Sequence, residues 1–444
     1  MKQFLTIALW AGLPFVLLGI SARVIKRSWL APGAFFVLYW GVACVGPLVL
    51  SPGDKVSAGA VYWIFLSTLT VLLGDFVGAF GRKEKQMRAR NVVFSGSQVS
   101  FISSVVICCS IVGLISFVIV LNSAGQGLRP FLSVEGFVNV AHKIASHSHD
   151  RTYRPFLSQF LNMFLYAGPL FGGVLVAISQ RRRYVIIAAL PILPALLMTA
   201  VFTLRGFTVI SILLWISSYV ATRVLLGHYQ LFTKRHIIVG LLIVVLLFII
   251  VTGAGFARRG SIDKRSIAAA YIDARTCAFG HMAVFSDWFE RGGLQVNNPL
   301  PGAYTFAGIV DLLGIREREV GLFTETVTLS SGDTSTIYTV FRVLIEDFSP
   351  LGSLFVLFLV AFLASRVYQR LLQGDARAMP ILAAFYATVL WSFCTSIWIW
   401  NSIIAAFVLF ATGFLIMLDL HTVKSLVGTL YSRFNKVIHP WKQA

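Results

Sequence analysis

The chain has 444 residues, of which 57% are hydrophobic and only 12% are charged, a balance far from that of a soluble globular domain. Its formal net charge of +19 could suit nucleic acid, but the lysines and arginines form short clusters beside apolar runs instead of one basic face. The composition therefore indicates an all-α, polytopic integral membrane protein without a nucleic-acid partner.

Eleven apolar runs are long enough to cross a bilayer as helices, which takes roughly 20 residues each. In chain order they cover residues 3–22, 29–50, 58–80, 99–121, 156–178, 184–202, 206–224, 237–254, 349–370, 379–397 and 401–420. Because no repeat or separate soluble domain interrupts them, we predict one membrane domain over residues 1–444 with about 11 transmembrane helices.

Lysines and arginines gather on every second connection between these runs. The clusters are Arg23, Lys26 and Arg27; Arg82, Lys83, Lys85, Arg88 and Arg90; Arg181, Arg182 and Arg183; Lys234 and Arg235; Arg366, Arg370 and Arg377; and Lys424, Arg433, Lys436 and Lys442. By the positive-inside rule these connections face the cytoplasm, which predicts an external N-terminus and an internal C-terminus. Because the first basic cluster follows the first run instead of preceding it, we expect this run to be a span and not a cleaved signal peptide.

Residues 122–155 form a small outward segment that is too polar to span. Apolar residues at helical spacing between Phe131 and Ile144 predict a short helix on the outer surface. His147, His149 and Asp150 follow, but their spacing matches no zinc pattern, so we expect a solvated loop and predict neither a metal nor a cofactor.

The largest outward connection, residues 255–347, lies between the eighth and ninth runs. It holds eleven of the 18 acidic residues but only nine of the 37 basic ones. Ser261 and Gly292 are suited to begin and end a helix, and the residues between them predict an amphipathic helix packed on the bundle or in the lipid interface. Residues 328–336 are rich in Ser, Gly and Thr and predict a mobile loop. A connection of this length is rarely passive, so we expect the functional site here.

Four arginines lie near the predicted outer plane. Arg205 sits between two runs, Arg258 and Arg259 directly follow the eighth run, and Arg342 precedes the ninth. Guanidinium groups pair with phosphate oxygens and stay charged, so these residues are candidates for binding a diphosphate. The structural alternatives are an interfacial anchor for Arg205 and an ion pair between Arg342 and a residue four positions on.

Two carboxylates follow Arg342. Glu346 and Asp347 are candidates for a general base or for groups that orient the arginines. Asp75 and Arg223, near the other ends of their runs, are expected to be interfacial. The chain has no Asp-x-Asp pair and no phosphate loop, which argues against a metal-dependent sugar-nucleotide transferase and against ATP use. The pattern favours group transfer from a lipid diphosphate.

Three stretches resemble the Wzy-type O-antigen polymerases, or oligosaccharide repeat-unit polymerases, of bacterial inner membranes. Arg205-Gly206 is similar to the small-Arg-Gly element of that family, residues 302–310 to its Gly-x-x-Thr-Phe stretch, and residues 337–352 to the stretch that enters an Asp-Phe-Gly-x-x-Gly turn. Ser349 departs from the pattern, because glycine is usual there.

This resemblance implies a metal-independent glycosyltransferase at the periplasmic face of the inner membrane, with a periplasmic N-terminus and a cytoplasmic C-terminus. A growing glycan would move from undecaprenyl diphosphate onto an incoming lipid-linked repeat unit, with the four arginines stabilising the leaving diphosphate. Asp347 or Glu346 would act as the base, and Tyr304, Tyr338 and Trp288 would offer aromatic faces to sugars.

The partners implied by the resemblance are undecaprenyl-diphosphate-linked oligosaccharide, membrane lipids, a chain-length regulator and a flippase. Two other activities remain open. An O-antigen ligase, which transfers the glycan to lipid A core, has a similar architecture. A lipid-linked oligosaccharide flippase would carry charged residues near the middle of its spans, whereas the charges of this chain concentrate at the ends of its apolar runs.

Overall fold

The computed structural model describes residues 2–51, 53–80, 92–127, 129, 133–146, 156–179, 181–202, 205–228, 234–259, 264–295, 300–316 and 322–419. The α-helices are α1 (Lys2–Lys26), α2 (Pro32–Leu50), α3 (Ala58–Ala79), α4 (Gly96–Ser123), α5 (Val134–Ser146), α6 (Phe156–Ile178), α7 (Arg182–Ala189), α8 (Ile192–Phe202), α9 (Gly206–Leu225), α10 (Lys234–Arg259), α11 (Lys264–Phe279), α12 (His281–Glu290), α13 (Ala307–Leu312), α14 (Val340–Leu372), α15 (Met379–Trp391) and α16 (Asn401–Leu418). Two short 3-10 helices, η3 (Ala376–Ala378) and η4 (Ile397–Ile399), and one antiparallel pair of strands, β1 (Val327–Thr328) and β2 (Thr334–Ser335), complete the described elements.

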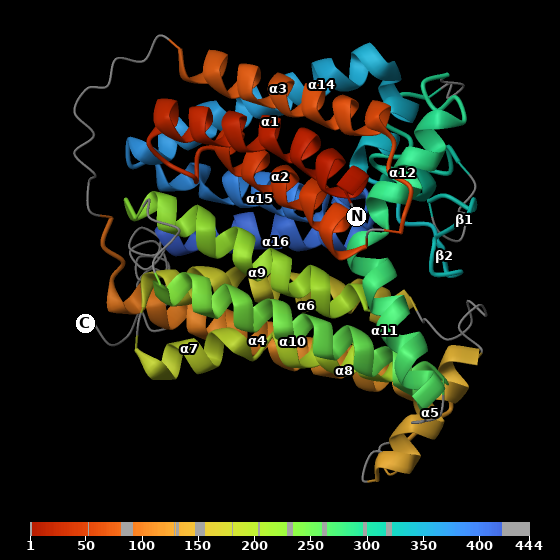
Figure 1. Cartoon of the computed structure of the whole chain (residues 1–444). Coiled ribbons are helices and arrows are strands. Elements are labelled where there is room, and N and C mark those ends of the chain that lie inside the picture. Colours follow the sequence, from red (N-terminus) through yellow and green to blue (C-terminus); the bar gives the residue numbers. More distant parts are fainter. Residues whose placement is uncertain are drawn as a thin grey trace, which may run out of the picture.

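The long helices lie side by side in one bundle, with α5, α11, α12 and the strands gathered at one end (Figure 1). Within the described residues, eight helical segments are long and apolar enough to cross a membrane. Three shorter apolar helices, Gly12–Val24, Val245–Phe256 and Ala376–Trp391, fall in three further runs that the sequence marks as spans. The predicted class, an all-α membrane-embedded protein, is confirmed, and the count of eleven spans stays a prediction.

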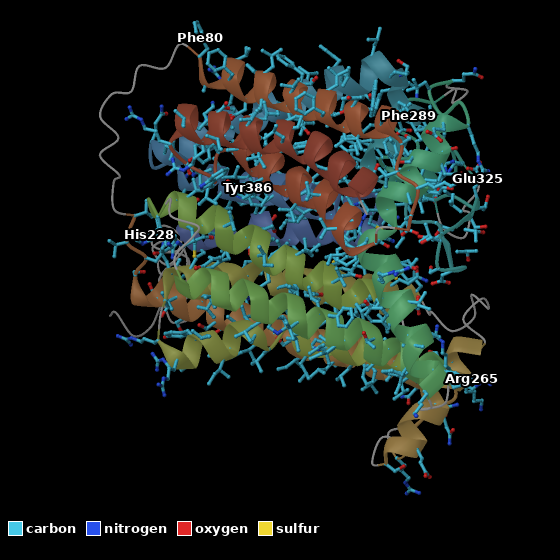
Figure 2. All side chains as sticks on the ribbon, viewed as in Figure 1. Phe80, His228, Arg265, Phe289, Glu325 and Tyr386 are labelled. Atoms are coloured by element: carbon cyan, nitrogen blue, oxygen red, sulfur yellow. The ribbon has the colours of Figure 1, made fainter. Side chains whose placement is uncertain are left out.

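The two ends of the bundle separate the outward and inward connections as the charge pattern predicts. Glu325, Phe289 and Arg265 lie at one end, and Phe80 and His228 lie at the other (Figure 2). Three predicted outward connections contact the 255–347 segment, through the pairs Asp54–Ser330, Arg205–Asp273 and Asn401–Gly308. Which end faces the cytoplasm stays a prediction.

One predicted span is broken. Residues 184–202 form two helices, α7 and α8, with a turn at Leu190 and Pro191 between them. Pro191 has no backbone N–H to continue the helical ladder. A Cβ atom on Gly168 of α6 would lie 2.9 Å from the Cβ of Pro191, so the proline packs directly against the neighbouring helix.

Another span begins earlier than predicted and bends. α14 starts at Val340, nine residues before the predicted run, and is kinked at Ser349, where φ is 64° and ψ is 168°. This conformation is one that glycine adopts easily and other residues rarely do. Pro350 follows directly, at the first turn of the second helical segment, where its missing backbone N–H is tolerated. Asp347 therefore ends a first helical segment that stands apart from the long apolar one.

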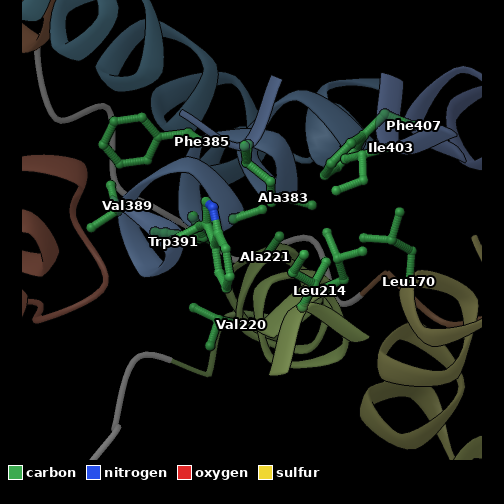
Figure 3. Close-up of a cluster of buried hydrophobic side chains, with 14 of the residues drawn as sticks. Leu170, Leu214, Val220, Ala221, Ala383, Phe385, Val389, Trp391, Ile403 and Phe407 are labelled. Atoms are coloured by element: carbon green, nitrogen blue, oxygen red, sulfur yellow. The ribbon is translucent and has the colours of Figure 1, made fainter. Parts of the chain in front are cut away.

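Small residues let the long helices approach one another closely. In α3, Gly74 and Gly78 face the backbone of α14, and a Cβ atom on Gly78 would lie 2.6 Å from the carbonyl oxygen of Phe362. Such glycine spacing is common where membrane helices pack backbone to backbone. In the bundle interior, Leu214 and Ala221 of α9 lie opposite Ala383 of α15 (Figure 3).

The acidic residue expected at the inward interface is buried. Asp75 lies near the end of α3 as predicted, but its side chain is covered and its carboxylate lies 3.3 Å from Lys26 Nζ. Arg223 is half-exposed and lies over the ring of Tyr219, 5.9 Å from its centroid, as suits an interfacial residue.

Two expectations for the outward segments need correction. The predicted single helix is two helices, α11 and α12, which meet at Gly280, a residue that weakens a helix. Gly280 also packs closely against Leu329, since an added Cβ atom would lie 2.9 Å from Leu329 Cδ1. The residues predicted to form a mobile loop, 328–336, instead belong to the β1–β2 hairpin. Its turn is held by Asp54, whose Oδ1 accepts hydrogen bonds from Ser330 N at 2.9 Å and Ser330 Oγ at 2.6 Å. The short outer helix after residue 131 is present as α5.

Candidate functional site

Two of the predicted arginines meet at one carboxylate. Arg205 precedes α9, Arg259 ends α10, and Asp273 projects from α11. Arg205 Nη1 donates to Asp273 Oδ1 at 2.9 Å, its Nη2 pairs with Oδ2, and Arg259 Nη2 lies 3.7 Å from the same Oδ2. This end of the bundle therefore holds two guanidinium groups around a single negative charge, which we call the arginine cluster.

A glycine makes room for the arginine cluster. A Cβ atom on Gly255 would lie 3.2 Å from Arg205 Nη2 and 3.4 Å from Arg259 Nη1. The carbonyl oxygen of Gly255 also accepts a hydrogen bond from Arg259 Nη1 at 3.3 Å. The backbone of α10 thus forms one wall of the cluster, and any larger residue at position 255 would crowd both guanidinium groups.

The cluster keeps one unit of positive charge. Burial would lower the pKa of Arg205, but its hydrogen bonds to Asp273 and the charge of that carboxylate raise it, so the guanidinium stays protonated. Burial raises the pKa of the Cys277 thiol, which accepts a hydrogen bond from Arg205 Nη1 at 2.9 Å and remains neutral. Two arginines and one aspartate then sum to +1, which suits an anionic ligand that can share or replace the Asp273 contacts.

Of the other two predicted arginines, the structure describes the side chain of Arg342 alone. The side chain of Arg258 lies outside the described residues. Arg342 makes its ion pairs with Glu325 and Glu346 and not with Asp273. The ion pair between Arg342 and Glu346, four positions on in α14, is the structural alternative that the sequence offered, and a role of Arg342 in binding diphosphate stays a prediction.

A cavity of about 600 Å³ lies beside Arg342 at the same end of the bundle. It is lined by Asp287, Trp288, Arg291, Gly292, Gly293, Gln295, Tyr304, Glu325, Thr326, Val327, Tyr338 and Glu346. These residues come from α12, the segment before α13, the hairpin and the start of α14. All three aromatic residues predicted to contact sugars lie in its wall, together with Glu346.

Arg342 contacts three residues of the cavity wall, Tyr338, Glu325 and Glu346. Its guanidinium lies between the rings of Phe323 and Tyr338, 3.8 and 4.0 Å from their centroids, and its side chain is only 5% exposed. Nε donates to Glu346 Oε1 at 2.7 Å, and Nη2 lies 3.0 Å from Glu325 Oε2. Stacking on aromatic faces and pairing with carboxylates are both favourable for a guanidinium, so Arg342 fixes the cavity lining in place.

Asp347 holds the cavity together without lining it. Its Oδ1 accepts from Tyr304 N at 2.8 Å, and its Oδ2 accepts from Thr305 N and Thr305 Oγ1, each at 2.6 Å. Three donors satisfy the buried carboxylate and tie the segment before α13 to α14. Asp347 is therefore a positioning residue for Tyr304 in this geometry.

Sequence patterns missed several members of these sites. Asp273 is visible on the polar face of the predicted helix, but nothing in the sequence connects it with Arg205, 68 positions earlier. Phe323 and Glu325 lie in an irregular stretch without periodicity, so no signal pointed to them. In the part of the chain that the structure describes, no three His, Cys, Asp or Glu side chains are grouped to hold a metal. His147, His149 and Asp150 lie outside the described residues.

The fold and the composition together define the class of this protein, which is a membrane-embedded, all-α protein with its polar clusters at one end of the helix bundle. No protein-family model matches the chain, and it matches neither a curated protein nor a solved structure.

Proposed function

We propose that this protein is a glycosyltransferase that joins oligosaccharide repeat units linked to undecaprenyl diphosphate, at the periplasmic face of a bacterial inner membrane. The observation that carries the proposal is that the arginine cluster and the aromatic, carboxylate-lined cavity occupy the same end of the bundle. A charged group suited to phosphate and a lining suited to sugars are what a lipid-linked glycan requires.

In the proposed reaction the donor diphosphate binds Arg205 and Arg259. The bond between the anomeric carbon and the phosphate oxygen breaks, and its electron pair moves to the diphosphate, where both guanidinium groups stabilise the new charge. A hydroxyl group of the acceptor glycan bonds to the anomeric carbon and loses its proton. The products are a lengthened lipid-linked glycan and free undecaprenyl diphosphate.

We propose Asp273 as the group that takes this proton, in place of Glu346 and Asp347. The base must reach a hydroxyl next to the carbon that leaves the diphosphate, and Asp273 is the carboxylate that contacts both arginines of the cluster. The hydroxyl becomes strongly acidic as its oxygen bonds to the oxocarbenium-like carbon, so a carboxylate suffices to take its proton. Glu346 then orients sugars in the cavity, and Asp347 holds its wall.

The experiment uses the purified protein in lipid vesicles with repeat units on undecaprenyl diphosphate. We expect a ladder of longer lipid-linked chains, and loss of that ladder in Arg205→Ala and Arg259→Ala. Arg370→Ala is a control, because Arg370 is exposed in the last turn of α14, away from the site. A product that forms only when lipid A core is supplied would make the protein a ligase. Wild-type protein that is folded and inactive with both acceptors would overturn the proposal, as would full activity of both cluster variants.

A further inference from the structure

The short helix α13 turns its large apolar side chains away from the protein. Leu312 and Leu313 are 75% and 67% exposed, and Phe306 and Ile309 are also exposed. On the opposite side, Gly308 packs so closely that a Cβ atom would lie 2.6 Å from the carbonyl oxygen of Ile399. A helix that faced water would present the reverse pattern, with polar residues outward.

α13 is tied to the start of a membrane-spanning helix. Asp347 binds the two residues before Phe306, and just past the kink at Ser349 the long segment of α14 begins with Leu351, which is 80% exposed. Phe355, Leu359 and Leu363 follow at four-residue spacing, and all three are exposed apolar residues of a helix long enough to cross a membrane. This stripe is where α14 meets hydrocarbon.

We propose that α13 is an interfacial helix that inserts its outward face, Phe306, Ile309, Leu312 and Leu313, into the outer leaflet of the membrane. Lipid chains are the occupant that the geometry favours, because Asp347 ties the start of α13 to α14 only a few residues before its exposed apolar stripe begins at Leu351. The polar boundary of this face is marked by the ion pair between Arg316 Nε and Asp311 Oδ1 at 2.9 Å. Amphipathic helices of this kind lie in the plane of the headgroups.

This placement sets the depth of the cavity. Tyr304 lines the cavity and lies two residues before Phe306, so α13 in the outer leaflet would place this part of the cavity wall near the level of the headgroups. A lipid-linked molecule can therefore present its head to the cavity while its chain stays in the bilayer. The inference about α13 does not depend on the reaction proposed above, because it concerns only where the helix lies.

The experiment attaches a nitroxide label to Leu312→Cys in a Cys108→Ser background, since Cys108 is exposed on α4. The protein is placed in nanodiscs of phosphatidylethanolamine and phosphatidylglycerol, and collisions with oxygen and with a water-soluble nickel chelate are measured. Leu363→Cys serves as the reference in lipid, and Thr334→Cys on the hairpin as the reference in water. Signal from the remaining native cysteines is subtracted with the labelled Cys108→Ser protein.

We expect the ratio of oxygen to nickel collisions at Leu312 to be several-fold higher than at Thr334 and lower than at Leu363, because an interfacial helix lies shallower than the middle of α14. A ratio equal to that of Thr334 would overturn the proposal, because it would place α13 in water. Spin–spin broadening with low access to both reagents would also overturn it, in favour of a second copy of the chain covering the face. A label at Leu313→Cys repeats the measurement one residue away.

Discussion

The carboxylate of Asp273 binds the guanidinium of Arg205 with both of its oxygens, and one of these bonds, from Arg205 Nη1 to Oδ1, is 2.9 Å long. The two residues come from different helices, α11 and the start of α9, so this pair fixes the outward segment to the bundle. It also leaves the second arginine of the cluster, Arg259, only partly neutralised at 3.7 Å. Because Asp273 contacts both arginines, we expect a substitution of Asp273, as well as of either arginine, to change the rate of the proposed reaction.

Replacing Asp273 by Asn should reduce glycan transfer by about 10²-fold or more, because general-base catalysis typically contributes 10²–10⁴. The amide keeps the size of the side chain and one hydrogen-bond acceptor, so the protein should remain folded. The measurement is single-turnover transfer with lipid-linked repeat units, with thermal unfolding recorded in parallel. Asp375→Asn is the matched control, since Asp375 pairs with Arg370 near the opposite end of α14 and should leave transfer unchanged. Equal rates for both variants would remove Asp273 from the mechanism.

Replacing Arg342 by Ala should destabilise the protein by about 3 kcal/mol, because it leaves Glu346 without its buried partner and removes the stacking on two rings. The measurement is the shift in unfolding midpoint in detergent. Arg291→Ala provides the comparison, since Arg291 is 73% exposed and its pair with Asp287 should contribute at most about 1 kcal/mol. If the unfolding midpoint of Arg342→Ala equals that of Arg291→Ala, the packing of Arg342 between the rings of Phe323 and Tyr338 does not stabilise the fold.

The helical membrane class could be predicted from composition and run length, because hydrocarbon leaves no choice but helices for long apolar segments. The helical spacing of apolar residues also predicted α5. The breaks at Pro191 and Gly280 were not predicted, although both residue types weaken helices, because the apolar residues on either side were interpreted as continuous runs. The sites were not predicted for a different reason, since pairs such as Arg205 with Asp273 form only when separate connections meet at one end of the bundle. For Arg342, the sequence already contained the partner that the structure shows, since Glu346 lies four residues further along the same helix.

Asp54 should hold the hairpin that forms one wall of the cavity. Burial would raise the pKa of Asp54, but its hydrogen bonds to Ser330 and Ser51 outweigh burial and lower it. Because the pKa of Asp54 is lower in the folded state than in the unfolded chain, the ionised carboxylate stabilises the fold above the usual pKa of 3.8. This stabilisation is lost as pH falls through the pKa that Asp54 has in the folded protein.

We therefore expect Asp54→Asn to speed hydrogen exchange of residues 327–335 at neutral pH. The wild-type hairpin should loosen in the same way only in acid, below its lowered pKa. Asp333→Asn is the control, because the side chain of Asp333 accepts a local bond from Thr334 N at 3.1 Å and its backbone bond with Leu329 N is kept in the variant, so exchange should be unchanged. Slow exchange in Asp54→Asn would mean that the buried Leu329 holds the hairpin without the turn.

His281 should make the fold sensitive to mild acid. It is buried at the start of α12 beside the rings of Trp40 and Phe393, with Nε2 3.1 Å from the carbonyl oxygen of Ala43, and burial lowers its pKa from 6.5 to about 4. Between these values the unfolded chain binds a proton that the folded protein excludes. Stability should therefore fall as pH drops from 6.5 to about 4, by on the order of 3 kcal/mol. His281→Gln should flatten the pH dependence of the unfolding midpoint, while His142→Gln, on the exposed side of α5, should preserve it. An unchanged slope in His281→Gln would assign the acid sensitivity to other groups.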